Sequence, residues 1–238
     1  MAAGIDAPAC VSLPMLPGDT WEMAHRFPPI HLANCSHLSS PSGGSKMRIS
    51  PVTPCFTPGS LIATDRGAIP VETLRSGDKV VTRDNGLKRI YWLGRREVSF
   101  RELRREGELV PVVVRAGSLG DGLPRRDMLV SPSHRFLVSP DQAFLTMDGE
   151  ALVAARHLVD GRRVHFAKTL GVSYVHLLCD AHQVILADGV WTETFHPDDQ
   201  VMRGLGNSQR REILELFPEV ETMGATARFP SAREIRER

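Results

Sequence analysis

Residues 55–64 read Cys55-Phe56-Thr57-Pro58-Gly59-Ser60-Leu61-Ile62-Ala63-Thr64, a lone cysteine placed directly ahead of a predicted strand. Further along, Ser131-Pro132-Ser133-His134 supplies a hydroxyl and an imidazole. A thiol needs a base to become a thiolate, and an amide that breaks needs a proton on its nitrogen. Cys55, Ser131 and His134 are therefore candidate residues for acyl chemistry.

The composition is that of one globular domain with tails. The 238 residues are 42% hydrophobic and 24% charged, enough for one sizeable core. The net charge is +1, so no overall field favours nucleic acid or an anionic membrane. No apolar run approaches the roughly 20 residues that span a bilayer, and the start of the chain lacks the features of a secretory signal. We expect a monomer without nucleic-acid or membrane partners, either cytoplasmic or exported by a non-classical route.

The four cysteines lie far apart, at positions 10, 35, 55 and 179, and form no C-x-x-C pair. This spacing favours reduced thiols over a disulfide framework or a zinc ribbon. Metal-capable side chains also occur over residues 31–37, but no fourth ligand is evident there. We expect neither a metal nor an organic cofactor. Cys179, within an apolar run, is interpreted as a core residue of a strand.

Short alternating segments separated by turn residues predict an all-β fold after Cys55. Asp84-Asn85-Gly86 predicts a tight hairpin, because Asn and Gly accept a positive φ. Ser99 is expected to cap a short helix over residues 99–105. The predicted strands cover residues 61–64, 68–71, 79–82, 88–94, 110–114, 128–130, 135–138, 174–180, 183–187 and 190–193.

Three parts are predicted along the chain. Residues 1–50 form an irregular leader rich in Pro, Ser and Gly, residues 51–200 form the β domain, and residues 201–238 form a helix and tail. The helix is expected over residues 207–217, with Ile213, Leu216 and Phe217 on one apolar face, and Pro218 ends it. The last fifteen residues, which are polar and basic, are expected to drape on the domain or fray.

The second half of the β domain echoes the first. Residues 62–67 are followed by the pattern Leu-x-x-Gly-x-x-Val at residues 74–80, and residues 145–149 are followed by the same pattern at residues 158–164. The repeated order predicts two duplicated, pseudo-twofold-related β subunits. The alternative is that glycine turns between short strands look alike in any β protein.

Four landmarks together resemble the Hint module, the self-processing fold shared by Hedgehog C-terminal domains and inteins. They are residues 55–64, residues 71–78, residues 131–135 and residues 174–189, in that order. The opening looks closest to a bacterial Hint subfamily that begins C-F-T-P-G-[ST]-L-I-A-T. The resemblance covers about residues 52–195, and it implies a horseshoe or disc of short strands.

The resemblance also implies a mechanism. Cys55 would attack the carbonyl of Pro54 and convert the Pro54–Cys55 amide into a thioester, with the leader as the chain's own substrate. His134 would donate a proton to the leaving nitrogen, and Ser131 stands where the family has threonine. Asp180 and His182 loosely match a late family element and could assist the second step, hydrolysis or acyl transfer.

The chain departs from two branches of the family. Splicing inteins end in His-Asn, whereas the matching run here, residues 188–194, contains no asparagine to cyclise. Splicing and C-terminal release are therefore not expected. Only some forty residues follow, without a recognisable sterol-binding region, so cholesterol transfer is not expected either.

Two further readings stay open beside a self-cleaving domain. The chain could be an inert Hint-like β module that serves interaction or attachment, with its motif residues retained for packing. It could instead be a hydrolase that uses Cys55 and His134 on other molecules, although the leader runs straight into the nucleophile. His176 and Trp191 are assigned no functional role from the sequence.

Overall fold

The computed structural model describes residues 53–138 and 149–236, which form mainly short strands with a few short helices. The all-β prediction is confirmed. The strands are β1 (Leu61–Thr64), β2 (Gly67–Pro70), β3 (Lys79–Val81), β4 (Leu87–Ser99), β5 (Val112–Val114), β6 (Met128–Val130), β7 (Arg135–Val138), β8 (Ala151–Ala154), β9 (Val164–Phe166), β10 (Gly171–Cys179), β11 (Val184–Ala187), β12 (Val190–Glu193) and β13 (Glu234–Arg236).

The strands form two sheets. The larger has ten strands in the order β10-β4-β3-β1-β11-β12-β7-β8-β13, with β2 paired to β1, and the smaller has the order β6-β5-β9. The helices are α2 (Phe100–Arg105), α3 (Asp199–Gly204), α4 (Asn207–Leu216), α5 (Val220–Met223) and α6 (Ala225–Arg228), with 3-10 helices η1 (Val71–Thr73), η2 (Gly107–Leu109) and η3 (Ala155–Leu158).

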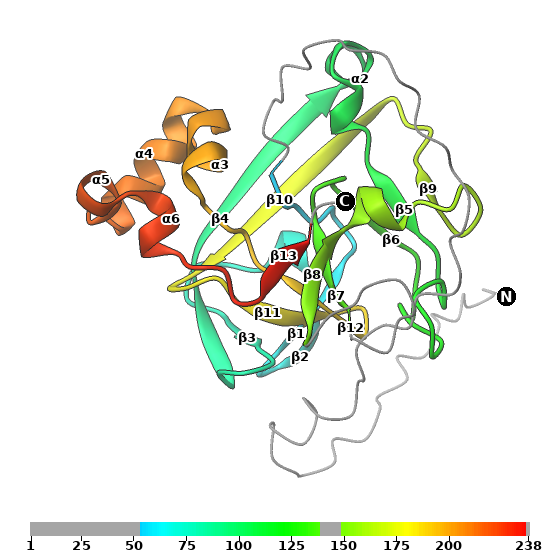
Figure 1. Ribbon diagram of the computed structural model, residues 1–238, viewed down its shortest axis with the longest axis horizontal. Helices are drawn as coiled ribbons and strands as arrows, with labels where there is room; N and C mark the ends of the chain where they lie inside the picture. The colour runs from blue at the N-terminus through cyan, green and yellow to red at the C-terminus, as the bar shows by residue number, and fades with distance from the viewer. Residues whose placement is uncertain (1–52, 139–148, 237–238) are drawn as a thin grey trace, which may run out of the picture.

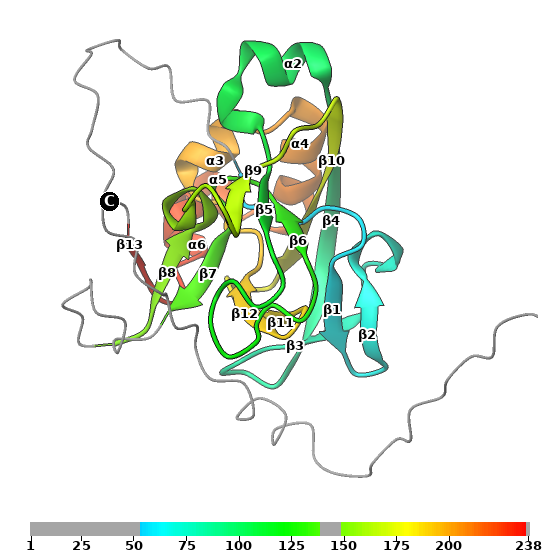
Figure 2. The same ribbon diagram turned by 90° about the vertical axis from the view of Figure 1, so that its right-hand side faces the viewer.

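The predicted hairpin at residues 84–86 joins β3 to β4, and Gly86 there has a φ of 62°. β4 is longer than predicted and continues through the charged residues 95–97, where alternation is lost. It continues because β10 pairs with it from Ser99 back to Ile90, which satisfies the backbone groups independently of the side chains. β4 and β10 form a long pair, and β4 ends in α2, at the opposite end from the β3–β4 turn (Figure 2).

The local elements repeat as the sequence echo predicts. In the first half, η1 is followed by Leu74, a turn at Gly77 and β3. In the second half, η3 ends at Leu158 and is likewise followed by a turn at Gly161 and by β9. The two glycines have φ angles of 99° and 76°, in the left-handed region that glycine reaches without a Cβ clash. Both leucines are buried in the same apolar cluster. Residues 145–148, part of the second copy, lie outside the described residues, as does the leader.

The helices agree in part with the prediction. Ser99 caps α2 through a capping box with Glu102, and α4 occupies the predicted segment. Ile213 and Phe217 are buried, but Leu216 is 45% exposed, so its predicted place on the apolar face is wrong. Leu216 is the last residue of α4, and Phe217 is its C-cap with a φ of −134°, so the helical spacing that would place the three residues on one face ends before Phe217.

The last fifteen residues, as far as residue 236, lie on the domain as α6 and β13, so the alternative that they fray is wrong. α5 and α6 follow α4, and β13 pairs in parallel with β8 at the edge of the large sheet. Helices α3–α6 gather on one side of the β4–β10 pair (Figure 1). Apolar residues of these helices pack on Trp92, Leu178 and Phe195. Among the described residues, no helix combines the length and apolar character needed to cross a membrane.

Gly94 on β4 tests the packing between the sheet and these helices. A Cβ at Gly94 would lie 2.1 Å from the ring of Trp92, so Gly94→Ala forces this ring to move. We expect a loss of about 1–3 kcal/mol in the free energy of unfolding, measured by urea denaturation. The matched control is Gly107→Ala, where nothing lies within 4 Å of the new Cβ and where we expect a change within about 0.5 kcal/mol. Equal stability of the two variants would contradict the packing argument.

Candidate functional site

Backbone pairing on both sides of Phe56 builds the site. Phe56 forms isolated antiparallel bridges with Val130 at the end of β6 and with Val175 in β10. Phe56 and Val175 exchange both backbone hydrogen bonds, at 3.0 and 2.9 Å. In an antiparallel register, the residue before Phe56 lies opposite the residues after Val130 and Val175. Cys55 is thereby placed opposite Ser131 on one side and His176 on the other.

Ser131 holds the backbone on both sides of the Pro54–Cys55 bond. Its hydroxyl accepts a hydrogen bond from the Cys55 N–H at 2.9 Å and donates one to the Thr53 carbonyl at 2.8 Å. Its own N–H donates to the Cys55 carbonyl at 3.0 Å. The residue that the sequence singles out beside His134 therefore fixes the orientation of the peptide bond before Cys55.

The thiol of Cys55 faces His176. The Cys55 Sγ lies 3.3 Å from the Nδ1 of His176, and it also lies 3.1 Å from the Thr53 carbonyl, to which the S–H can donate. Both side chains are almost fully buried. The His176 imidazole also forms a hydrogen bond with the backbone of Pro54. One imidazole thus contacts the sulfur and the residue whose carbonyl the sulfur would attack.

Burial keeps this pair uncharged. It raises the pKa of the Cys55 thiol to about 12, against the opposing effect of hydrogen bonds from Thr53 and Ser131. It lowers the pKa of His176 to about 4, although the hydrogen bond with Pro54 partly opposes the shift. A neutral thiol and a neutral imidazole therefore face each other at rest.

His134 lies against Phe56, with ring centroids 4.5 Å apart. Its Nε2 lies 2.5 Å from the hydroxyl of Thr192, which itself donates to the Arg135 carbonyl, so the proton of the neutral ring is on Nε2. Among the described residues, its buried Nδ1 has no hydrogen-bond partner. Burial lowers the pKa of His134 to about 4. The structure brings Ser131 into contact with Cys55, but gives no hydrogen bond between the His134 ring and Cys55.

A second buried polar cluster surrounds Glu193 at the end of β12. Arg135 forms an ion pair with this carboxylate at 3.0 Å, and the Nε2 of His182 lies 3.1 Å from it. The Nδ1 of His182 accepts the Ala232 N–H, so Nε2 is the donor. Burial raises the pKa of Glu193, but Arg135 and His182 outweigh burial and hold it below its usual value. His196 stacks on His182, with centroids 4.3 Å apart.

Asp180 and His182 are engaged away from the thiol. The backbone carbonyl of Asp180 accepts a hydrogen bond from Arg228, the Oδ1 of its side chain is buried without a hydrogen-bond partner among the described residues, and His182 is held by Glu193 and Ala232. In the part of the chain that the structure describes, neither forms a hydrogen bond with Cys55. Their role in a second step stays a prediction.

Sequence reasoning missed His176. Tyr174-Val175-His176-Leu177 was recognised as a landmark, but its alternation alone gives no reason to prefer this histidine over a core histidine. The signal is the register, since pairing of Val175 with Phe56 places the next residue opposite Cys55. The buried Cys179, in contrast, is the strand core residue that the sequence predicts.

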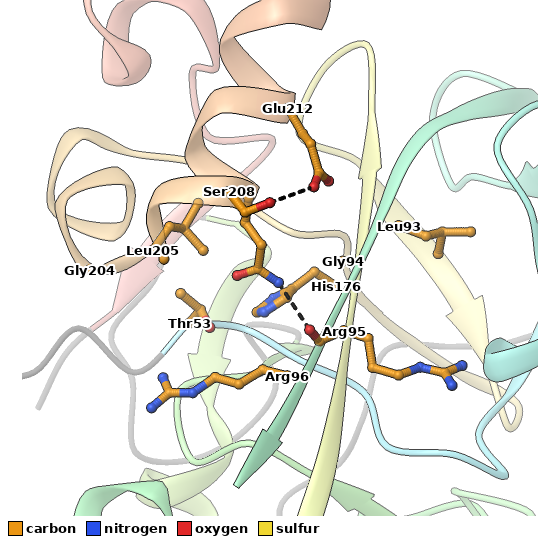
Figure 3. A pocket seen from close by; sticks show the side chains of 12 residues that line it. Thr53, Leu93, Gly94, Arg95, Arg96, His176, Gly204, Leu205, Ser208 and Glu212 are labelled. Carbon is orange, nitrogen blue, oxygen red and sulfur yellow. Dashed lines mark hydrogen bonds between the residues drawn. The ribbon is translucent and has the colours of Figure 1, made fainter.

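A pocket of about 720 Å³ opens beside Thr53 and His176. β4 lines one side, and the end of α3 and first turns of α4 line the other. Figure 3 shows the His176 ring in the middle, the Arg96 guanidinium toward Thr53 and Glu212 at the far end. Across the described ranges, no group of three or more His, Cys, Asp or Glu residues is placed to hold a metal ion.

The family model for the Hint domain matches residues 54–199. Among solved structures, an intein-like domain from Clostridium thermocellum is 15% identical, with 59% of this chain and 97% of that domain covered and a TM-score of 0.40. A DnaB intein from Synechocystis sp. PCC 6803 is 10% identical, with coverages of 59% and 98% and a TM-score of 0.37. A comparison with curated proteins found no match.

The family model begins one residue before the candidate nucleophile Cys55 and extends beyond β12, which is more than half of the chain. The chain therefore belongs to the Hint domain family, the self-processing modules of Hedgehog proteins and inteins.

Proposed function

We propose that this Hint domain cleaves its own chain at the Pro54–Cys55 bond through a thioester. The observation that carries the proposal is the 3.3 Å contact between the Cys55 sulfur and the Nδ1 of His176, beside a peptide bond that Ser131 holds in place. The substrate is the chain's own leader, residues 1–54. Splicing is not part of the proposal.

The first step is an N-to-S acyl shift. The thiol gives its proton to the Nδ1 of His176 as the sulfur attacks the Pro54 carbonyl carbon, and the hydrogen bond from His176 to Pro54 favours the developing oxyanion. The C–N bond then breaks and the Cys55 nitrogen takes up a proton. The Ser131 hydroxyl lies 2.9 Å from this nitrogen, and we assign the donation to His134 acting from Nδ1, which first takes up a proton from solvent, while His176 returns the thiol proton to solvent.

In the second step, water or another nucleophile attacks the thioester carbonyl and releases the leader. The Cys55 sulfur leaves as a thiol and takes the proton that the nucleophile loses. A fragment that begins at Cys55 remains.

The geometry favours cleavage in cis over a hydrolase that acts on other molecules. The Thr53 carbonyl is held by the Ser131 hydroxyl and by the Cys55 thiol, so the chain's own backbone occupies the place that a separate substrate would need. An inert module remains the competing reading, and the experiments below separate it from a self-cleaving domain.

Thiol-dependent cleavage is the direct test. Incubation of the full chain with dithiothreitol or hydroxylamine should release residues 1–54 as an adduct and leave a fragment starting at Cys55, both identified by intact mass spectrometry. Cys55→Ala should abolish both products, because no thioester can form. Cys179→Ala is the matched control, since it also removes a buried thiol, and should cleave like the parent chain. An intact parent chain under all conditions would support the inert module.

Substitutions of His176 and Ser131 should slow cleavage. His176→Gln removes the base next to the sulfur and should lower the rate of dithiothreitol cleavage about 10²–10⁴-fold. Ser131→Ala should also slow cleavage, whereas Ser131→Thr keeps the hydroxyl and should retain most of the rate. The rate is followed by gel densitometry, with folding checked by circular dichroism. Full activity of a folded His176→Gln chain would remove His176 from the mechanism.

The same burial predicts a pH dependence of stability. The folded-state pKa of His176 lies at about 4, below the ordinary value of 6.5, so the unfolded chain takes up a proton that the folded chain excludes. This contribution to stability is complete above about pH 6.5 and is lost as the pH falls toward about 4, by about 3 kcal/mol. His176→Gln should therefore lose about 3 kcal/mol less than the parent between about pH 7 and about pH 4 in urea denaturation. Parallel pH profiles would contradict a buried, neutral His176.

A further inference from the structure

The pocket lined by Thr53 and His176 adjoins residues on both sides of the proposed reaction: the chain before the cleaved bond and the imidazole next to the sulfur. His176 contacts the Cys55 sulfur, and Thr53 immediately precedes Pro54. A nucleophile that resolves a thioester must reach the Pro54 carbonyl carbon, and the pocket is lined by Thr53, the residue before Pro54, and by His176. The second step therefore has a defined place in the structure.

The pocket is larger than hydrolysis requires. A water molecule occupies about 30 Å³, whereas pockets that bind small molecules have volumes of about 300–1,000 Å³. At about 720 Å³, the pocket has the volume of a small-molecule binding site. Its walls also include the Leu205 side chain and the amide of Gln209, which donates to the Arg95 carbonyl at 3.1 Å. The size favours an acceptor larger than water.

The charges in the pocket indicate the chemistry of this acceptor. The Glu212 carboxylate is occupied, because it accepts hydrogen bonds from the Trp92 indole N–H at 2.7 Å and from the Ser208 hydroxyl at 3.2 Å. Arg96 is held loosely, since among the described residues it forms one ion pair, with Glu102 across 4.0 Å. A guanidinium that faces a pocket in this way suits a carboxylate or another small anion.

The positive charge of Arg96 affects the pKa values of Cys55 and His176. Burial dominates the pKa values of Cys55 and His176, but the positive charge of Arg96 acts on both and lowers each. Arg95, the next residue along β4, donates from its guanidinium to the Glu72 carbonyl and points away from the His176 ring in Figure 3. Arg96 is thus the arginine of this pair that lies on the reaction side.

We propose that this pocket binds the acyl acceptor, a small amine that carries an anionic group, with the anion on Arg96 and the amine next to His176. The proposal rests on the proposed thioester and specifies its second substrate. The amine nitrogen attacks the Pro54 carbonyl carbon, the C–S bond breaks, and His176 carries the proton from nitrogen to sulfur. The product is the leader joined to the acceptor through an amide.

An amine fits the neutral site better than an alcohol. His176, whose pKa lies at about 4, is a weak base, and an alcohol holds its proton more tightly than the thiol from which His176 accepts one during the first step. The neutral form of an amine, which has lost its ammonium proton to solvent, attacks with its own lone pair, and its nitrogen becomes acidic once the C–N bond has begun to form. His176 then needs to accept a proton that is already labile.

Glycine and ethanolamine provide a matched pair of probes, since both are small primary amines and only glycine carries a carboxylate. With the full chain, glycine should give a leader–glycine amide at a rate that saturates with concentration, whereas ethanolamine should react more slowly and without saturation. Intact mass spectrometry and fragmentation locate the adduct at Pro54. Equal, non-saturating rates with the two amines would overturn the proposal.

Two variants test the location of the acceptor. Arg96→Gln should raise the half-saturating glycine concentration about tenfold or more and lower the ratio of the glycine rate to the ethanolamine rate, a ratio in which any effect of Arg96 on thioester formation cancels. Leu205→Trp should reduce both amine reactions by filling the pocket, while cleavage by hydroxylamine, a smaller nucleophile, persists. Arg89→Gln, an exposed arginine on the same strand, is the charge-matched control and should behave like the parent. An unchanged glycine response in Arg96→Gln would overturn the assignment of Arg96.

The hydroxylamine reaction tests the thioester separately from the acyl acceptor. If hydroxylamine cleaves the chain but glycine shows no preference, the thioester stands and the acceptor assignment is wrong. If hydroxylamine gives no cleavage, both the proposed function and this inference are wrong.

Discussion

The site depends on a single residue that pairs on two sides. Phe56 bridges Val130 and Val175, and it is buried in the main apolar cluster of the domain. Side chains in a strand alternate between faces, so a slip of one residue on either side would turn Ser131 or His176 away from Cys55. Burial of Phe56 opposes such a slip, because the slip would expose its ring. The apolar core thus fixes the register, and the register assembles the polar site.

The electrostatics of the site follow from the same burial. Desolvation keeps the Cys55 thiol protonated and the rings of His134 and His176 neutral, so the resting site contains no ion pair at the reacting bond. Proton transfer between the thiol and His176 is therefore strongly uphill, and the proposed reaction has to couple it to attack on the carbonyl. Charge is concentrated instead in the separate cluster around Glu193, where Arg135 and His182 balance the buried carboxylate. A domain built in this way can fold around its own uncleaved backbone.

Local sequence patterns predicted most of the fold and part of the site. The hairpin at residues 84–86, the cap at Ser99 and the two Leu-x-x-Gly-x-x-Val repeats depend on neighbouring residues, and the structure contains them. The length of β4 was missed because its charged segment is held by pairing with β10. His176 was missed for the same reason, since its position opposite a cysteine 121 residues away depends on tertiary pairing. The order after α4 was missed because β13 is stabilised by β8 rather than by its own sequence.

The segment after β12 is joined to the site through Trp92. The indole ring of Trp92 stacks on His176, with centroids 5.9 Å apart and an interplanar angle of 19°, and its N–H donates to Glu212 of α4. The same ring packs in the apolar cluster formed by α3–α6 and lies directly over Gly94. A shift of α4 would therefore move the Trp92 ring, and His176 could not keep its position against the sulfur without it. The helices that follow the β domain are for this reason part of the candidate site, because they line the pocket and hold the ring that stacks on His176.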